Sequence, residues 1–108
     1  MFYDPRATQC FLYKHAIDCR KAHNGLVYLV TEVMGQELRS GAIFLFVSRD
    51  RKTAKAIKWD GSGAIVFHKK MERGRIMRFD GLANTVSLTA EELGQVMSGA
   101  QVRLDLKM

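Results

Sequence analysis

Basic side chains concentrate in one part of this chain. Residues 49–78 contain ten of the 17 lysines and arginines but only three acids, Asp50, Asp60 and Glu72, so this stretch carries +7 while the rest sums to −1. Guanidinium and ammonium groups bind phosphate oxygens through charge-assisted hydrogen bonds. This pattern indicates a polyanionic partner such as a nucleic acid. The alternative is a solvated basic face that only keeps the protein soluble.

Ten basic residues are candidates for contacts with nucleic-acid phosphates. Arg20 and Lys21 fall in the first turn of a predicted helix, a place that disfavours cations unless an anion is shared with the free backbone N–H groups. The alternative there is two side chains that point into water. The other candidates lie in a turn, on a hairpin and in the segment beyond it. The full set is Arg20, Lys21, Arg49, Arg51, Lys52, Lys55, Lys69, Lys70, Arg73 and Arg75.

Three carboxylates could assemble a divalent-metal site for a nuclease reaction. Each also has a structural interpretation. Asp18 suits the N-cap of a helix, Asp60 the first position of a hairpin turn, and Glu72 a charge partner of the nearby lysines and arginines. We therefore predict a protein that is not an enzyme, and a small metal-dependent nuclease is the less favoured alternative.

The cysteines and histidines give a weak metal signal. Cys10 and Cys19 alternate with His15 and His23, which could supply four zinc ligands, but no pair has the short spacing that usually anchors such a site. No glycine-rich nucleotide-binding motif occurs either. The sequence therefore predicts no metal and no cofactor.

The elements that would position these residues follow from periodicity and turn chemistry. Apolar residues at helical spacing predict a longer N-terminal helix at 18–34, with an aspartate N-cap and Gly35 as its stop. Because Gly25 inside that run costs about 1 kcal/mol relative to alanine, the helix could instead begin at Asn24. Thr89 and Glu92 form a capping-box pattern for a short C-terminal helix that ends at Gly99. Strands are predicted at 8–14, 42–47, 54–59, 64–70 and 85–88, with two further candidates in 71–78 and in the tail around Val102, Leu104 and Leu106.

The strands at 54–59 and 64–70 form a predicted hairpin. The turn Asp60-Gly61-Ser62-Gly63 supplies glycines where positive φ is needed, and a two-residue turn pairs Trp59 with Ala64 and Ile57 with Val66. One face then carries Lys55, Ile57, Trp59, Ala64, Val66 and His68, and the other carries Lys58, Ile65, Phe67 and Lys69. Since both faces mix apolar and cationic residues, the pattern leaves open which one is buried.

The ring of Trp59 has two interpretations. It is either an anchor in the core, which we favour, or an exposed platform for a nucleic-acid base, where stacking contributes about 1–3 kcal/mol per base. The second interpretation would favour single strands or distorted ends.

The element order predicts an α+β fold in a single domain over residues 1–108. The connections of hairpin length favour a mainly antiparallel sheet that contains a central meander, with one longer N-terminal helix and one short C-terminal helix on the same face. The run 42–47 has no polar face, which places it in the middle of the sheet. No apolar run approaches the roughly 20 residues that span a bilayer, so we expect no membrane contact.

An ordered series of motifs resembles one known family. The motifs are a first block from Asp18 to Leu26, then IFLFVSRDR, KAIKWDGSG, FHKKMERGR and LTAEEL, collinear over residues 11–99. They resemble the TnpB-type accessory protein, the product of the second open reading frame, of transposons in insertion-sequence family sixty-six. Two positions depart from the family pattern: Ala22 stands where many relatives have glycine, and Lys58 replaces an apolar residue before the tryptophan.

The resemblance implies a protein that is encoded beside a larger transposase and supports transposition, with no known catalytic centre and no established active-site residues to carry over. Together with the charge pattern it leads us to expect an accessory factor that binds DNA at transposon ends and assists the transposase. The alternative is a protein-interaction module that docks the transposase without touching DNA. Such a protein would act in the bacterial cytoplasm, at the nucleoid, and homo-oligomerisation is left open.

Overall fold

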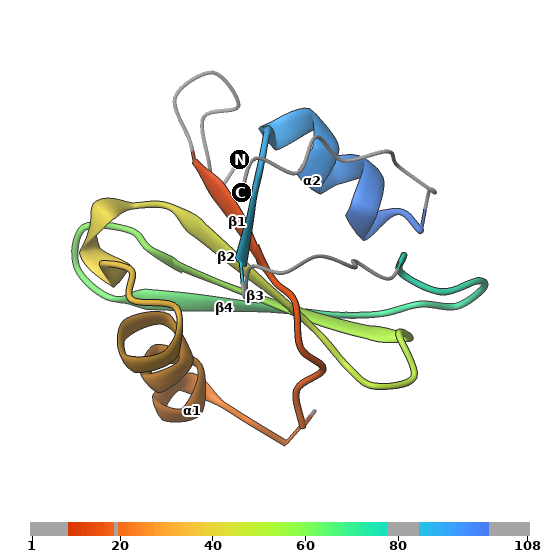
Figure 1. The fold of residues 1–108 in the computed structure, drawn as a ribbon, viewed down its shortest axis with the longest axis horizontal. Helices are drawn as coiled ribbons and strands as arrows, with labels where there is room; N and C mark the ends of the chain where they lie inside the picture. Colours follow the sequence, from red (N-terminus) through yellow and green to blue (C-terminus); the bar gives the residue numbers. More distant parts are fainter. Residues whose placement is uncertain (1–8, 19, 78–84, 100–108) are drawn as a thin grey trace.

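In the computed structural model, which describes residues 9–18, 20–77 and 85–99, five strands form one mixed sheet with a helix on each side (Figure 1). The strand order across the sheet is β4-β3-β2-β1-β5. The strands are β1 (Cys10–Tyr13), β2 (Ile43–Val47), β3 (Thr53–Trp59), β4 (Ala64–Lys70) and β5 (Thr85–Leu88). All five strands predicted between residues 8 and 88 are present, with ends that shift by up to two residues.

The pairing of β1 with β2 corrects the prediction of a mainly antiparallel sheet. These two strands run parallel, with Cys10 opposite Ile43 and Leu12 opposite Leu45, while the other neighbouring pairs are antiparallel. Parallel neighbours need a crossover connection, and the helical segment between them supplies it. The predicted meander β2-β3-β4 is confirmed, but it occupies one half of a mixed sheet.

The helices lie on opposite faces of the sheet, so the prediction that both cover one face is wrong (Figure 1). Strand β2 explains this arrangement. Phe44 and Phe46 pack in the cluster that contains Leu26 of α1 (His23–Tyr28), whereas Ile43 and Leu45 pack in the cluster with α2 (Ala90–Met97). Because successive side chains of a strand point to opposite faces, a strand without a polar residue must be covered twice.

The N-terminal helix is shorter than the favoured prediction and begins later, one residue before the alternative start at Asn24. The α-helical part α1 starts at His23 with Ala22 as an N-cap that makes no side-chain bond, and a π-helical segment, η1 (Leu29–Val33), continues it. Asp18 is not the N-cap, because its carboxylate closes a local turn by accepting from the backbone N–H of Arg20 at 2.9 Å. The predicted stop is confirmed, since Gly35 has a φ of 66° just after η1.

The C-terminal helix α2 forms as its sequence predicts. The Thr89 hydroxyl accepts from the N–H of Glu92 at 3.0 Å, and the Glu92 carboxylate accepts from the N–H of Thr89 at 2.8 Å, which completes the capping box. Gly99, with a φ of 87°, follows its last turn. A short 3₁₀ turn, η2 (Leu38–Ser40), precedes β2.

The predicted hairpin register is confirmed over its whole length. Trp59 lies opposite Ala64 and Ile57 opposite Val66. The Asp60 carboxylate accepts from the N–H groups of Ser62 and Gly63, each at 2.9 Å, and so shapes the turn. The structure also settles the faces: the set with Ile57 looks toward α1, and the set with Phe67 looks toward α2.

Trp59 packs against the core on the α1 side, in agreement with the favoured interpretation. Its ring is half-buried, and the guanidinium carbon of Arg39 lies 4.9 Å from the ring centroid in cation–π geometry.

Three remaining expectations concern chain segments and membranes. Residues 71–77 form bends and irregular chain instead of a strand. The tail strand around Val102, Leu104 and Leu106 lies outside the described residues. None of the helices in the described ranges is long and apolar enough to cross a bilayer.

Candidate nucleic-acid interface

Two segments that are distant in the sequence meet at one end of the sheet. The chain between β2 and β3 lies against the chain after β4, because the N–H of Met71 donates to the carbonyl of Lys52 at 2.6 Å and that of Ile76 donates to the carbonyl of Arg51 at 2.8 Å. We call the cationic surface they form the basic end. Its members are Arg49, Arg51, Lys52, Lys70, Arg73 and Arg75, all exposed except the half-buried Arg51.

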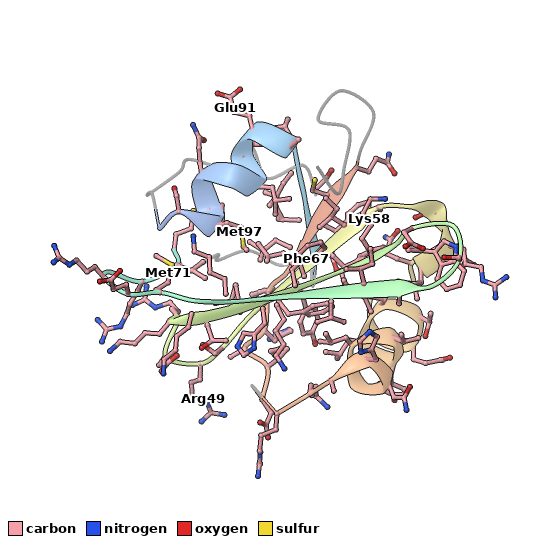
Figure 2. The ribbon with its side chains drawn as sticks, turned by 180° about the vertical axis from the view of Figure 1, so that it is seen from behind. Arg49, Lys58, Phe67, Met71, Glu91 and Met97 are labelled. Atoms are coloured by element: carbon pink, nitrogen blue, oxygen red, sulfur yellow. The ribbon has the colours of Figure 1, made fainter. Side chains whose placement is uncertain are left out.

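Within the described part of the chain, none of the six side chains of the basic end forms an ion pair. The acids nearest in sequence are Asp50 and Glu72, so six cations stand against two carboxylates. Figure 2 shows Arg49 extending from this end of the sheet, away from the side that carries α2.

Asp50 is engaged in shaping the turn that presents the first group of cations. Its Oδ1 accepts from the Ser48 hydroxyl at 2.7 Å and from the N–H of Lys52 at 3.0 Å, while the Ser48 hydroxyl oxygen accepts from the N–H of Thr53 at 3.1 Å. Arg51 completes the turn in the left-handed region, with a φ of 61°. The turn is therefore held by side-chain hydrogen bonds, and the Asp50 carboxylate is used to bond the backbone of its own turn.

The ionisation of Asp50 fits this role. The hydrogen bond from Ser48 and the one from the backbone of Lys52 lower the pKa of its carboxyl, and the positive charges of Lys52 and Arg75 lower it further. The influence of Arg75 shows that the two segments of the basic end are within electrostatic reach of each other.

Four predicted site residues lie elsewhere and have structural roles or partners. Lys55 donates from Nζ to the carbonyl of Lys21 at 2.6 Å, which ties β3 to the loop before α1. Lys69 donates to the carbonyl of Met97 at 2.7 Å, where a cation suits the negative end of the α2 dipole. These two lysines hold elements together instead of extending the basic end.

The phosphate site expected at Arg20 and Lys21 is not assembled as predicted. Both residues precede α1, so neither lies in the first turn of a helix. Arg20 pairs with Asp18, its Nη2 lying 2.7 Å from Oδ2, and these hydrogen bonds hold the pKa of the Asp18 carboxyl well below its usual value. The carbonyl of Lys21 accepts the hydrogen bond from Nζ of Lys55.

Lys14 and His15 are neighbours of the basic end that the sequence did not indicate. They follow β1, and the parallel pairing of β1 with β2 brings their strand end beside Arg49 and Arg51. An open pocket of about 240 Å³ lies between them, lined also by Tyr13, Ser48 and Met77. Apart from Tyr13, every ionisable residue of its lining is basic. Nothing in the local sequence could reveal this, because the proximity depends on strand order.

The carboxylates of the nuclease alternative do not converge. Asp60 lies at the turn of the β3–β4 hairpin and Glu72 just beyond its other end, so seven residues of strand, about 23 Å, separate them. Asp18 is paired with Arg20 near α1. Among the residues that the structure describes, no three metal-ligating side chains of His, Cys, Asp or Glu come together.

Two members of the zinc alternative, Cys10 and His23, are buried or already have a partner. Burial raises the pKa of the Cys10 thiol to about 11, which keeps it protonated near neutral pH. The Nε2 of His23 lies 3.1 Å from the carbonyl oxygen of Ala64. Cys19 lies outside the described residues.

Comparisons with known proteins identify the family to which the chain is similar. Residues 8–105 match the family described as IS66 Orf2 like protein. The chain is 28% identical over 94 residues to the uncharacterized protein y4jC of Sinorhizobium fredii, covering 87% of this chain and 80% of that protein. It is also 28% identical over 86 residues to the uncharacterized protein y4hO of the same organism, covering 80% and 75%. No solved structure matches.

Proposed function

The chain belongs to the family of IS66 Orf2-like proteins, and from this premise we propose that it is a non-catalytic accessory factor for DNA transposition that binds DNA through its basic end. The observation that carries the proposal is the gathering of six cations on two loops, joined by backbone hydrogen bonds, and at the end of β4: Arg49, Arg51, Lys52, Lys70, Arg73 and Arg75. Lys14 and His15 would extend the same surface. The DNA would be an end of the transposon, and the factor would assist the transposase encoded beside it.

The arrangement favours contacts to the DNA backbone. Exposed lysines and arginines on a fixed loop framework can follow a row of phosphates, and phosphate contacts position a protein without reading sequence. No helix carries the cations of the basic end, so the surface lacks the recognition helix that enters a major groove in many DNA-binding proteins. We therefore expect modest sequence preference and strong dependence on salt.

The salt dependence tests the proposal directly. If the six cations each neutralise one phosphate, the logarithm of the affinity for duplex DNA should fall with the logarithm of the salt concentration with a slope of about −5. Binding to duplexes with and without a transposon end, measured by fluorescence anisotropy between low and physiological salt, gives this slope. Weak binding that does not respond to salt would contradict the DNA role.

Charge reversal locates the binding surface. Arg73→Glu and Arg75→Glu should each weaken binding almost equally on all sequences and make the salt slope shallower by at least about 1. Arg39→Glu is the matched control, because it makes the same change of charge on an exposed residue beside Trp59, at the far end of the hairpin. Equal losses in Arg39→Glu and Arg73→Glu would show that only net charge matters.

An interaction module is the second candidate, in which the same basic end docks an acidic region of the transposase. The exposed cations favour it as much as they favour DNA, because both partners present negative charge. Co-purification with the transposase from nuclease-treated extract at high salt, together with absence of DNA binding by the purified protein, would select this candidate.

A further inference from the structure

A second surface lies along the free edge of the sheet and meets the basic end only at Lys70, the last residue of β4. Strand β4 borders β3 on one side only; no described strand pairs with its other side, where the Nε2 of His23 lies 3.1 Å from the carbonyl oxygen of Ala64. The pairs Asp60/Gly63 and Lys52/Met71 are joined by backbone hydrogen bonds, so alternation places the inward-bonding groups of β4 at its odd residue numbers. The backbone groups of Val66, His68 and Lys70 therefore face outward along this edge.

An apolar pocket opens beside this edge, on the α2 side of the sheet. It has a volume of about 310 Å³ and is lined by Ala56 and Phe67 from the sheet and by Leu93, Gly94 and Met97 from α2, with His68 and Lys69 at the strand. Figure 2 shows Met97 on the face of α2 that looks toward the sheet and Phe67 below it, while Glu91 points away. Small residues create the space, since a Cβ placed on Gly94 would meet no atom within 4 Å.

The charge of the hairpin indicates the kind of partner. Between Thr53 and Lys70 the one acid is Asp60, which lies in the turn, against Lys55, Lys58, Lys69 and Lys70. Two of these lysines, Lys69 and Lys70, lie on the edge strand itself, where like charges discourage pairing with a second copy of the same edge. They favour a strand that carries carboxylates.

We propose that β4 and the pocket under α2 together bind an extended acidic peptide segment with one bulky apolar side chain. The segment would add as a sixth strand and bond to the outward-facing groups of Val66, His68 and Lys70. Cross-strand neighbours share a face, so the residue opposite Phe67 would enter the pocket between Phe67 and Met97. A carboxylate three residues farther along the segment would lie opposite Lys70, on the other face of the sheet.

A synthetic peptide tests this binding mode with the full chain. The probe alternates glutamate with valine and carries one central leucine; one control replaces that leucine by alanine, and another replaces every glutamate by lysine. The leucine peptide should bind at least about tenfold more tightly than the alanine peptide, because it buries the larger side chain. The lysine peptide should not bind. Equal binding of all three would overturn the proposal.

Filling the pocket gives the matched variant. Gly94→Leu places a side chain in the open space and should weaken binding of the leucine peptide at least about tenfold, whereas Gln95→Leu adds the same side chain to an exposed neighbour and should not. If circular dichroism shows that Gly94→Leu is unstable, Gly94→Ala, which favours the helix, replaces it, and a smaller loss of peptide binding is expected. DNA binding should be unchanged in all three variants, which separates this surface from the basic end.

Amide hydrogen exchange locates the contact independently of any variant. The amides of Val66, His68 and Lys70 should exchange fast in the free protein and slowly with the leucine peptide. Slow exchange without peptide would overturn the proposal. An exchange rate that depends on protein concentration would show that a second copy covers the edge. A rate independent of concentration would show that another part of this chain covers it.

Discussion

At the scale of single residues, the same cationic side chain takes one of two roles. Lys55 and Lys69 donate to main-chain carbonyls at 2.6 and 2.7 Å and so join separate elements. Arg73 and Arg75 are exposed and make no ion pair with a described residue. Composition cannot distinguish these roles, because the acceptor comes from another part of the fold. Substitutions of the first pair should reduce stability, and those of the second should reduce ligand binding.

Asp60 gives a prediction at the same scale. Its pKa is lowered by hydrogen bonds from the backbone N–H of Ser62 and Gly63 and from the Ser62 hydroxyl. The pKa of an aspartate in the unfolded chain is about 3.9. When folding lowers this pKa, the carboxylate stabilises the fold at pH values above the unfolded pKa, and the effect is lost as the pH falls through the folded-state pKa. Asp60→Ala should therefore lower the free energy of unfolding at pH 7, and the deficit should shrink below about pH 4.

Urea unfolding of both proteins at a series of pH values measures that deficit. Asp60→Asn is a useful control, because it keeps an oxygen acceptor for the turn but cannot ionise, so its smaller deficit should also shrink in acid. A deficit of Asp60→Ala that stays constant from pH 7 to pH 3 would show that the charge of Asp60 does not support the turn.

At the scale of elements, local chemistry decides where each element begins and ends. The hairpin register follows from the alternation of its side chains and from a turn that Asp60 and two glycines can form. The start of α2 follows from its capping box. The favoured start of α1 at Asp18 is wrong, because aspartate can cap a helix or close its own turn, and the two options look alike in sequence. The alternative start at Asn24 lies one residue from the observed one.

The capping box of α2 is open to a direct test. Thr89→Ala removes the acceptor for the N–H of Glu92 and should lower the free energy of unfolding by about 1 kcal/mol. Thr89→Ser retains the hydroxyl and should stay close to the wild type. The measurement is the urea midpoint at constant slope. Equal stability of the alanine variant and the wild type would mean that the box does not hold this helix end.

At the scale of the whole molecule, β2 contributes side chains to both apolar layers, so we expect the two layers to unfold together. Phe44 and Phe46 pack in the layer under α1, and Ile43 and Leu45 pack in the layer under α2. All four side chains are fully buried. Loss of packing on one face therefore removes support from the strand that the other face also needs.

Substitution in β2 tests this coupling. Phe44→Ala should cost about 3–5 kcal/mol and Leu45→Ala about 2–5 kcal/mol, a large part of the stability of a small domain. Both variants should unfold in a single transition. Fluorescence of Trp59, the one tryptophan, monitors the α1 side of the sheet, and amide exchange in α2 monitors the other side. Ser87→Ala, on an exposed site of β5, is the control. If Phe44→Ala disturbs only the tryptophan signal, the layers unfold separately.

The sequence by itself determined what depends on neighbours along the chain: the strands between residues 8 and 88, the hairpin register, the capping box, the central place of β2 and the resemblance to the family that the comparisons confirm. Tertiary structure alone decided the parallel pairing of β1 with β2 and, with it, the placement of Lys14 and His15 near the basic end. It also decided that the two helices take opposite faces, where they cover both sides of β2. It also decided which cations gather and which are tied to carbonyls. The physical reason is that periodicity and turn chemistry act over a few residues, whereas strand order and the partner of a long side chain depend on groups distant in the sequence that meet only in the folded chain.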